Sequence, residues 1–384
     1  MTVSEMIKEK KRTLGVSSKD LSDALGLGDD GESLLRSWER GESEPDSKMT
    51  ELINSFGNNP PYRGKVANPE FCYIDLFAGI GGIRIPFQEL GGECVFSSEW
   101  DRFSQKTYRV NFGETPSGDI TKIKSESIPN FDILLGGFPC QPFSQAGLHK
   151  GFADTRGTLF FEIERIIKDK RPKAFLLENV KQLKGHDGGR TFSVILEHLT
   201  ALDYYVAAKI LKANDFGLPQ IRERVYIVGF DKRFFHLEDD YEFPFPQPSG
   251  IKTRVGDILE SNVDEKYTIS DRLWSGHQRR KAENAQKGKG FGYSLVTADS
   301  PYTRTISARY YKDGSEILIE QDGKNPRKIT PRECARLQGF PDDYIIPVSD
   351  AQAYKQFGNS VAVPVVRAIA KKMLFEMKRF DHDE

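Results

Sequence analysis

The sequence predicts an α/β protein with a doubly wound, mostly parallel sheet, preceded by an all-α module and interrupted by a small irregular segment. Apolar runs alternate with amphipathic helical stretches over residues 71–230, which is typical of parallel strands covered by helices on both faces. Helical periodicity fills residues 1–55, and the alternation is lost over residues 245–325. A chain of 384 residues has room for the two or three domains that these changes of pattern imply.

The composition is that of a globular chain without a membrane anchor. Hydrophobic residues make up 38% and charged residues 29% of the sequence, and no apolar run approaches the ~20 residues needed to cross a bilayer. The N-terminus lacks the apolar core of a secretory signal, so we expect a cytoplasmic protein. Cys72, Cys94, Cys140 and Cys334 are too widely spaced for a disulfide framework or a zinc ligand pair, and no metal site is expected.

The net charge of −1 conceals an uneven distribution along the chain. Residues 1–70 carry ten Lys or Arg against thirteen Asp or Glu, whereas residues 272–312 carry nine against two, a net charge of +7. The second stretch also contains Trp274 and several tyrosines. A basic, aromatic-rich segment in a neutral chain indicates a nucleic-acid contact surface, although an ordinary solvated loop region would give the same charge pattern.

The first module has the plan of a helix, a glycine-containing turn and a second helix. Ser18 is placed to cap the first helix, and the second is expected over residues 32–40. The run over residues 5–55 resembles the repressor-type helix-turn-helix family, which would place Arg36 and Arg40 on the recognition helix. Because the segment is net acidic and its turn is long, a packing or dimerising module is the alternative.

A stretch rich in Pro, Gly and Asn, residues 57–69, is expected to be a linker. In doubly wound sheets ligands gather at the carboxyl ends of the strands, so the loops directly after the strands are the candidates for a functional site. The expected strands are residues 71–79, 93–99, 131–139, 174–180 and 224–230, with helices at 156–170 and 188–202 and a helical tail from residue 330.

The loops after the first strands have the features of a nucleotide site. The glycine-rich turn at residues 75–82 lets backbone approach a ligand closely before the next helix begins. Glu99 is placed to accept hydrogen bonds from both ribose hydroxyls, and Trp100 beside it offers a face for stacking. Asp119 and Ile120 are expected after a third short strand, where a carboxylate reads an adenine amino group. Nicotinamide enzymes and adenosylmethionine enzymes share such a turn, so this region leaves both open.

Reactive side chains follow the later strands. Cys140 stands in a Pro- and Gly-rich loop, where an exposed thiol can act as a thiolate nucleophile, whereas the other three cysteines have the character of small buried apolar residues. Glu178 ends the next strand among apolar neighbours, which raise the proton affinity of a carboxyl group and suit it to donate a proton. Arg222 and Arg224 alternate along an entering strand and are expected to point toward one pocket.

Taken in order, these motifs resemble those of the cytosine-5 DNA methyltransferase family over residues 71–370. The stretches that carry the resemblance are DLFAGIGG, EWD, GDIT, GGFPCQPFS, DTRGTLFFEI, ENV, QIRERVYIVGF, TPRECARLQGF and QFGNSVAVP. Each is weak alone, but their number and order make chance agreement negligible. The resemblance implies a Rossmann-like methyltransferase sheet, S-adenosyl-L-methionine as cofactor, S-adenosyl-L-homocysteine as its product, and double-stranded DNA as substrate.

The resemblance also implies a covalent mechanism. Cys140 would attack carbon 6 of a cytosine that has swung out of the duplex, while Glu178 holds or protonates ring nitrogen 3. Carbon 5 would then take the methyl group, and loss of its proton and of the Cys140 sulfur would leave 5-methylcytosine. Arg224 would contact the base oxygen, with Arg222 supporting the same pocket. The positions that match the family's cofactor site are Phe77, Gly79, Ile80, Gly82, Glu99, Trp100, Asp119, Ile120, Pro139, Leu159, Asn359, Ser360 and Val361.

The irregular segment lies where this family has its target-recognition domain. Its stretches GKGFGYSL and RTISARYYKDGSEILI resemble a subgroup that reads short palindromes beginning with CC and ending with GG, so CCGG, CCNGG or CCWGG is the expected target. Some members of that subgroup repress their own gene through an N-terminal helix-turn-helix, and a cognate restriction enzyme is implied. The expected DNA contacts are Arg279, Arg280, Lys289, Arg304, Thr305, Arg309 and Tyr310.

Two other functions remain open: a tRNA cytosine-5 methyltransferase, and a repressor with an inactive methyltransferase domain. The long recognition segment favours DNA over tRNA, and the presence of Cys140, Glu178 and Arg224 favours an enzyme. A monomer is expected on the substrate, with a dimer on a palindromic operator as the alternative. The expected domains are a helix-turn-helix domain (1–56), a linker (57–69), a catalytic domain (70–244 and 327–384) and a target-recognition domain (245–326).

Overall fold

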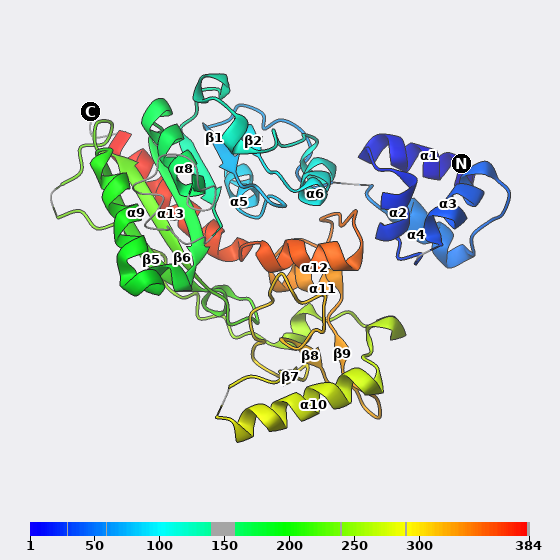
Figure 1. The fold of residues 1–384 in the computed structure, drawn as a ribbon. Coiled ribbons are helices and arrows are strands. Elements are labelled where there is room, and N and C mark those ends of the chain that lie inside the picture. Colours follow the sequence, from blue (N-terminus) through cyan, green and yellow to red (C-terminus); the bar gives the residue numbers. More distant parts are fainter. Residues whose placement is uncertain (29, 59, 140–157, 239, 289, 382–384) are drawn as a thin grey trace. The chain divides into compact units, whose positions relative to one another are not determined.

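The structure is a computed structural model that describes residues 1–28, 30–58, 60–139, 158–238, 240–288 and 290–381 (Figure 1). The strands are β1 Phe71–Leu76, β2 Gly92–Ser98, β3 Ile133–Gly137, β4 Ala174–Val180, β5 Tyr204–Lys212, β6 Glu223–Asp231, β7 Leu295–Val296, β8 Leu318–Ile319 and β9 Arg327–Lys328. The α-helices are α1 Val3–Leu14, α2 Ser18–Ala24, α3 Gly31–Arg40, α4 Ser47–Ser55, α5 Arg84–Glu89, α6 Arg102–Phe112, α8 Thr158–Lys170, α9 Arg190–Ala201, α10 Asp271–Gln286, α11 Pro331–Leu337, α12 Asp350–Asn359 and α13 Val363–Asp381. Short 3₁₀ helices are η1 Ile120–Lys122, η2 Ser125–Ser127, η3 Lys181–Gly189, η4 Ala213–Phe216, η5 Val255–Ile258 and η6 Glu265–Tyr267.

The chain forms two compact units, each assembled from three separate stretches of sequence. Unit 1 contains Met1–Gly64, Arg102–Thr115 and Lys252–Ser360. Unit 2 contains Lys65–Asp101, Pro116–Ile251 and Val361–Glu384. Within the described ranges, no helix is both long enough and apolar enough to cross a membrane.

Unit 2 is built on a six-stranded sheet with the order β2-β1-β3-β4-β6-β5. The pairs β1–β2, β1–β3 and β3–β4 are parallel, whereas β6 runs antiparallel to both β4 and β5. The mostly parallel, doubly wound sheet predicted from the sequence is therefore confirmed. The edge strand β5 was not among the expected strands, because its half-buried side chains include alanines and lysines, which are poor strand formers.

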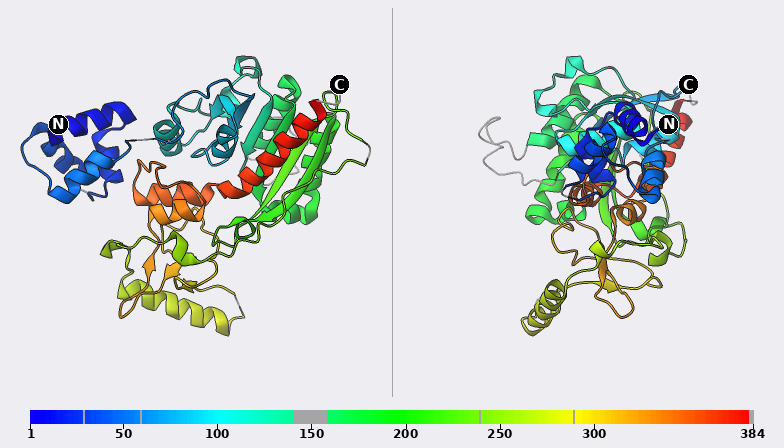
Figure 2. Two further views of the ribbon diagram at one scale, coloured as in Figure 1. Left: turned by 180° about the vertical axis from the view of Figure 1, so that it is seen from behind. Right: turned by 90° about the vertical axis from the view of Figure 1, so that its right-hand side faces the viewer.

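Helices cover both faces of this sheet, as Figures 1 and 2 show. Helices α5 and α13 pack on one face, where alternate residues such as Tyr73 and Leu176 join their core. Helices α8 and α9 pack on the other face, against the intervening residues such as Ile74 and Leu177. This alternation of side chains between two buried faces explains why the strands read as continuous apolar runs.

Three local expectations for the chain are corrected. In the described part of the chain, no strand lies between β2 and Asp119: this residue caps η1 by accepting the Thr121 N–H with its side chain, and the Ser117 N–H donates to the Ser97 carbonyl of β2. Ser17, not Ser18, caps α2, because its hydroxyl accepts the Asp20 N–H. Cys94 and Cys334 are buried as expected, but Cys72 is only half-buried.

In unit 1, the four helices α1 to α4 surround a small apolar core that also takes in side chains from much later in the chain. Val110 of α6 and Ile345 are fully or almost fully buried within it, together with Leu14 of α1. Polar contacts reinforce the packing: Lys106 of α6 forms an ion pair with Asp20 of α2. The N-terminal helices therefore share their core with α6 and with the loop that contains Ile345.

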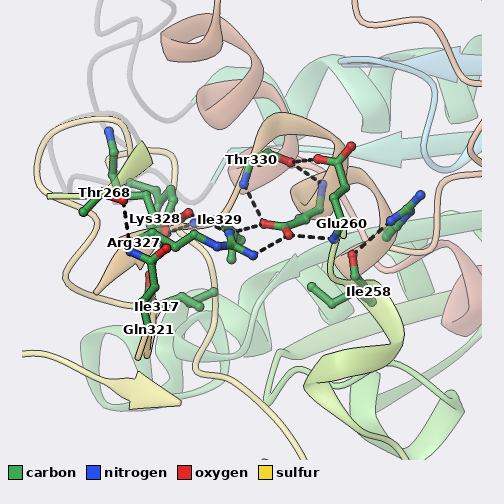
Figure 3. Close-up of polar contacts among 12 residues, drawn as sticks. Ile258, Glu260, Thr268, Ile317, Gln321, Arg327, Lys328, Ile329 and Thr330 are labelled. Atoms are coloured by element: carbon green, nitrogen blue, oxygen red, sulfur yellow. Dashed lines mark hydrogen bonds and ion pairs between the residues drawn. The ribbon is translucent and has the colours of Figure 1, made fainter. Parts of the chain in front are cut away.

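The rest of unit 1 contains a small sheet of order β7-β8-β9 and a buried polar network, shown in Figure 3. The guanidinium of Arg327 donates to both carboxylate oxygens of Glu333, at 2.8 Å each. The same carboxylate accepts the backbone N–H groups of Thr330 and Glu260, at 2.8 and 2.9 Å. Since every oxygen of Glu333 is satisfied, this buried charge holds β9, the start of α11 and the segment at Glu260 together.

Candidate active site and DNA-contacting segment

The turn after β1 is built to bring backbone close to a ligand. Phe77 and Gly79 adopt the left-handed conformation, with φ of 55° and 54°. The Ala78 N–H donates to the Ser98 carbonyl at 2.9 Å, which fastens the turn to the end of β2. Only the Phe77 carbonyl oxygen, at 4.0 Å, lies near the point where a side chain on Gly79 would begin, so glycine leaves room for a ligand beside this turn. Ile80 and Gly82 lie buried behind it.

Glu99 follows β2 directly and is held in place by the backbone. Its side chain is 8% exposed, and its two carboxylate oxygens accept the N–H groups of Gly79 and Asp101, both at 2.8 Å. Burial raises the pKa of Glu99, and these backbone hydrogen bonds partly offset the rise. Trp100, the next residue, is 81% exposed and presents its ring to solvent. An oriented acceptor beside an open aromatic face fits a bound adenosine.

The other expected cofactor positions are distributed over both units. Ile120 is buried at the start of η1, with Asp119 half-exposed before it. Pro139 is exposed and Leu159 is half-buried in the first turn of α8. Unit 1 ends with Asn359 and Ser360, whereas Val361 is buried in the core of unit 2. The turn, Glu99 and Trp100 thus form one arrangement in unit 2 that suits an adenosine cofactor, and Ile120 belongs to the apolar cluster against which Phe77 of this turn packs.

Glu178 and Arg224 meet at the end of the sheet. The Arg224 Nε lies 3.1 Å from the Glu178 Oε1, and both side chains are largely shielded from solvent. Burial raises the pKa of Glu178, while the charges of Arg224 and Arg222 counteract the rise. Arg222 is 1% exposed, and its burial lowers its pKa to about 9. The direction of the Glu178 shift agrees with the raised proton affinity expected from the sequence.

The antiparallel pairing of β4 and β6 explains this meeting. Glu178 lies opposite Tyr226, and Val180 lies opposite Arg224. Because side chains alternate along a strand, Arg224 and Tyr226 share one face with Glu178, and Arg224 is its diagonal neighbour. Glu178 lies near the carboxyl end of β4 and Arg224 near the amino end of β6, so both belong to the same edge of the sheet.

Two further contacts lead from Glu178 toward the expected nucleophile. A side chain on Gly137, the last residue of β3, would begin 3.6 Å from the Glu178 carboxylate, so glycine keeps this space clear. The Asn179 side-chain amide donates to the Phe138 carbonyl at 2.9 Å. Cys140 itself lies outside the described residues; Gly137, three positions before it in the sequence, is paired with Glu178 in the sheet. Asn179 was absent from the expected site residues, although its place next to Glu178 in the ENV motif could have indicated it.

In unit 1, two of the expected DNA contacts, Arg279 and Arg280, lie on α10, and four more lie between β7 and β8. Arg279 is 78% exposed, and Arg309 is also exposed. Arg304 stacks over the Phe291 ring, with its guanidinium carbon 4.5 Å from the ring centre. Arg280 is more constrained, because it pairs with Asp313 and donates to the ring of the buried His277. Thr305 is half-buried, and Lys289 lies outside the described residues.

Tyr310 corrects one of these expectations. Its side chain is fully buried, and its hydroxyl donates to the Ile317 carbonyl at 2.6 Å and accepts the Ile329 N–H at 2.9 Å. Such a side chain has no surface left for DNA. Tyr310 belongs to the core of unit 1, and its position in a basic segment concealed this role in the sequence.

The chain was compared with known proteins. The model of the family described as C-5 cytosine-specific DNA methylase matches residues 71–374. The Type II methyltransferase M.SsoII of Shigella sonnei is 61% identical over 373 residues, which cover 97% of this chain and 98% of that protein. The Type II methyltransferase M.NlaX of Neisseria lactamica is 67% identical over 306 residues, which cover 79% of this chain and 96% of that protein.

A solved structure supports the fold independently. The crystal structure of the S. pombe Dnmt2 methyltransferase superposes with a TM-score of 0.66 over 81% of this chain and all of that one, at 21% sequence identity. The chain therefore belongs to the C-5 cytosine-specific DNA methylase family and is an S-adenosylmethionine-dependent enzyme that methylates cytosine in DNA.

Proposed function

We propose that the protein is the modification methyltransferase of a Type II restriction-modification system, acting on bacterial DNA in the cytoplasm and protecting it from a cognate restriction enzyme. The observation that carries the proposal is the likeness to M.SsoII, named a Type II methyltransferase, over almost the full length of both chains. The buried pair of Glu178 and Arg224 gives the proposal its chemistry.

In the proposed reaction, the Cys140 thiolate bonds to carbon 6 of a flipped cytosine while Glu178 donates a hydrogen bond or a proton to ring nitrogen 3. A raised pKa keeps Glu178 protonated at a pH where an ordinary glutamate is ionised, which suits this role. Arg224 contacts the base oxygen, and Arg222 supports it. S-adenosylmethionine, when bound, would supply an electrophilic methyl group for carbon 5. Loss of the carbon-5 proton to solvent would then re-form the double bond between carbons 5 and 6 and release Cys140 as the thiolate.

The cofactor is proposed to lie against the turn after β1. Glu99 accepts hydrogen bonds from the ribose hydroxyls, Trp100 stacks on the adenine, and Asp119 reads the adenine amino group. Phe77, Gly79, Ile80, Gly82, Ile120, Pro139, Leu159, Asn359, Ser360 and Val361 are proposed to complete the site.

The target is proposed to be a palindrome beginning with CC and ending with GG, such as CCGG, CCNGG or CCWGG. Cations on exposed surface neutralise phosphates, and the open side chains on and after α10 fit this task. The proposed contacts are Arg279, Arg280, Lys289, Arg304, Thr305 and Arg309.

A second role, repression of its own gene, is proposed for the N-terminal helices. Arg36 and Arg40 are exposed on α3, as a recognition helix requires. Each is paired within the module, to Glu32 at 2.8 Å and to Glu42 at 2.6 Å, so binding to DNA would have to exchange these partners for phosphates or bases. The shared core with Val110 favours the alternative packing role, and the two roles are compatible.

Covalent trapping tests the reaction. Duplex DNA with 5-fluorocytosine at the target should become covalently attached to the protein in the presence of S-adenosylmethionine, because fluorine cannot leave carbon 5 as a proton does. Cys140→Ala should abolish the attachment, and trapping of that variant would refute the assigned nucleophile. Bisulfite or nanopore sequencing of DNA from cells that express the gene should locate 5-methylcytosine within CC…GG palindromes.

A further inference from the structure

Three strand ends meet at a single carboxylate near the proposed base pocket. Glu223 is the first residue of β6, and its Oε2 accepts a hydrogen bond from Lys181, the residue directly after β4. Its other oxygen lies 3.9 Å from the Nζ of Lys212, the last residue of β5. One acidic side chain therefore fastens the ends of β4, β6 and β5 to one another.

The same strands carry the pocket. Glu178 lies on β4 and Arg224 on β6, one residue beyond Glu223. Since successive side chains of a strand point to opposite faces, Glu223 is directed away from the face on which Arg224 meets Glu178. Its effect on the pocket must therefore pass through the backbone. One direct link is present, because the Arg224 Nη1 donates to the Glu223 carbonyl at 2.8 Å.

We propose that Glu223 is a positioning residue for the base pocket: with Lys181 and Lys212 it fixes the strand ends from which Arg224 reaches Glu178. This inference rests on the proposed function, since the pocket it serves is the one assigned to the target cytosine. We call the group of Glu223, Lys181 and Lys212 the clasp. Strand ends fray more readily than strand centres, so the clasp acts where the strands that carry the pocket are least constrained.

The exposure of the clasp indicates a local effect. The side chains of Lys181 and Lys212 are 47% and 50% exposed, and that of Glu223 is 22% exposed. Ion pairs of this kind add little to the stability of the whole fold. Loss of these ion pairs should therefore displace Arg224 and leave the melting temperature of the protein almost unchanged.

Glu223→Gln tests the proposal, because it keeps the size of the side chain and removes its charge. The single-turnover rate of methyl transfer should fall by about tenfold, as expected for a small misplacement of a substrate-contacting group. The KM for S-adenosylmethionine should not change. If Glu223 had a merely structural role, the Glu223→Gln variant would keep the native pH–rate profile. We expect the variant to shift that profile.

The pH shift has a defined direction. Among the residues that the structure describes, Arg224 and Arg222 lower the Glu178 pKa against burial, and Tyr226 lies opposite Glu178. A displaced Arg224 would lower the Glu178 pKa less. The alkaline limb of the pH–rate profile should then move upward, by about half a unit.

Two controls make the result specific. Lys181→Met should reproduce the effect, and the double variant with Glu223→Gln should be no slower than Glu223→Gln alone, because the two residues act through one contact. Asp231→Asn removes the partner of Arg171 at the opposite end of β6. It should lower the melting temperature without changing the rate or the pH profile.

The outcomes separate the two proposals. A Glu223→Gln variant with the native rate and pH profile overturns the positioning role, as do additive losses in the double variant. If Glu223→Gln does not fold, Lys181→Met alone decides, and a native rate in that variant also overturns the role. Failure of the native protein to trap on 5-fluorocytosine DNA overturns the proposed reaction instead.

Discussion

Charged side chains are buried at the end of the sheet in unit 2 but exposed to solvent on helix α10 in unit 1. Glu178 and Arg222 are 8% and 1% exposed, and burial shifts the pKa of both toward the neutral form. Arg279 on α10 is 78% exposed. Burial shifts the pKa of an ionisable side chain, and acid–base catalysis needs such a shift. A solvent-exposed cation instead keeps its ordinary charge and can replace the counterions of DNA phosphates. The two regions should therefore fail in different assays when they are mutated.

The largest effect is expected from Glu178→Gln, which should slow single-turnover methyl transfer by about 100- to 10,000-fold. DNA affinity should stay within about threefold of native, because the variant removes no phosphate contact. The active, protonated form of Glu178 is lost as the pH rises through its raised pKa, so the rate of the native enzyme should fall on the alkaline limb of the pH–rate profile. The variant should lack the limb. An unchanged rate in the variant would remove Glu178 from the mechanism.

A smaller effect is expected from the double variant Arg279→Ala/Arg304→Ala. Each lost phosphate contact should reduce the slope of log affinity against log salt by about one, with weaker binding to all sequences. The rate on saturating DNA should be close to native. Lys324→Ala is the matched control, since Lys324 is exposed in unit 1 but pairs with Glu265 at 2.9 Å. Binding that is as salt-sensitive as native would place the DNA surface elsewhere.

The smallest effect on methylation is expected from deletion of residues 1–56. Methyl transfer at 25 °C should stay within about threefold of native, because residues 1–56 carry none of the proposed catalytic or cofactor residues. The melting temperature should fall by about 5 °C, because exposure of Val110 and Ile345 costs on the order of 2 kcal/mol. A native melting temperature would show that the helices do not pack there in solution.

The fold and the cofactor turn were accessible from the sequence because they follow local rules. Buried strands are continuous apolar runs, and Glu99 and Arg224 stand at their ends, where α/β proteins bind ligands. The pairing of Glu178 with Arg224 required only that the two strand ends be neighbours.

Other features depend on long-range packing, which no local pattern encodes. The antiparallel strand β5 lies at the sheet edge and carries lysines, and Tyr310 lies in a basic stretch yet faces the core. Val110 and Ile345 complete the N-terminal core although they come from distant segments. The clasp at Glu223 depends on three strand ends that the sequence alone does not bring together.

The contact between Arg327 and Glu333 limits where the proposed target-recognition segment, residues 245–326, could be exchanged for that of a related enzyme. Glu333 is fully buried, and a chimera that imports a foreign residue in place of Arg327 would leave its carboxylate without a counter-charge, at a cost of about 3–5 kcal/mol. Crossover points placed after Glu260 and before Arg327 would retain all three partners of this carboxylate, which are Arg327 and the N–H groups of Thr330 and Glu260. Grafts that respect these junctions should inherit new target specificity on an intact scaffold, whereas grafts that cross them should misfold.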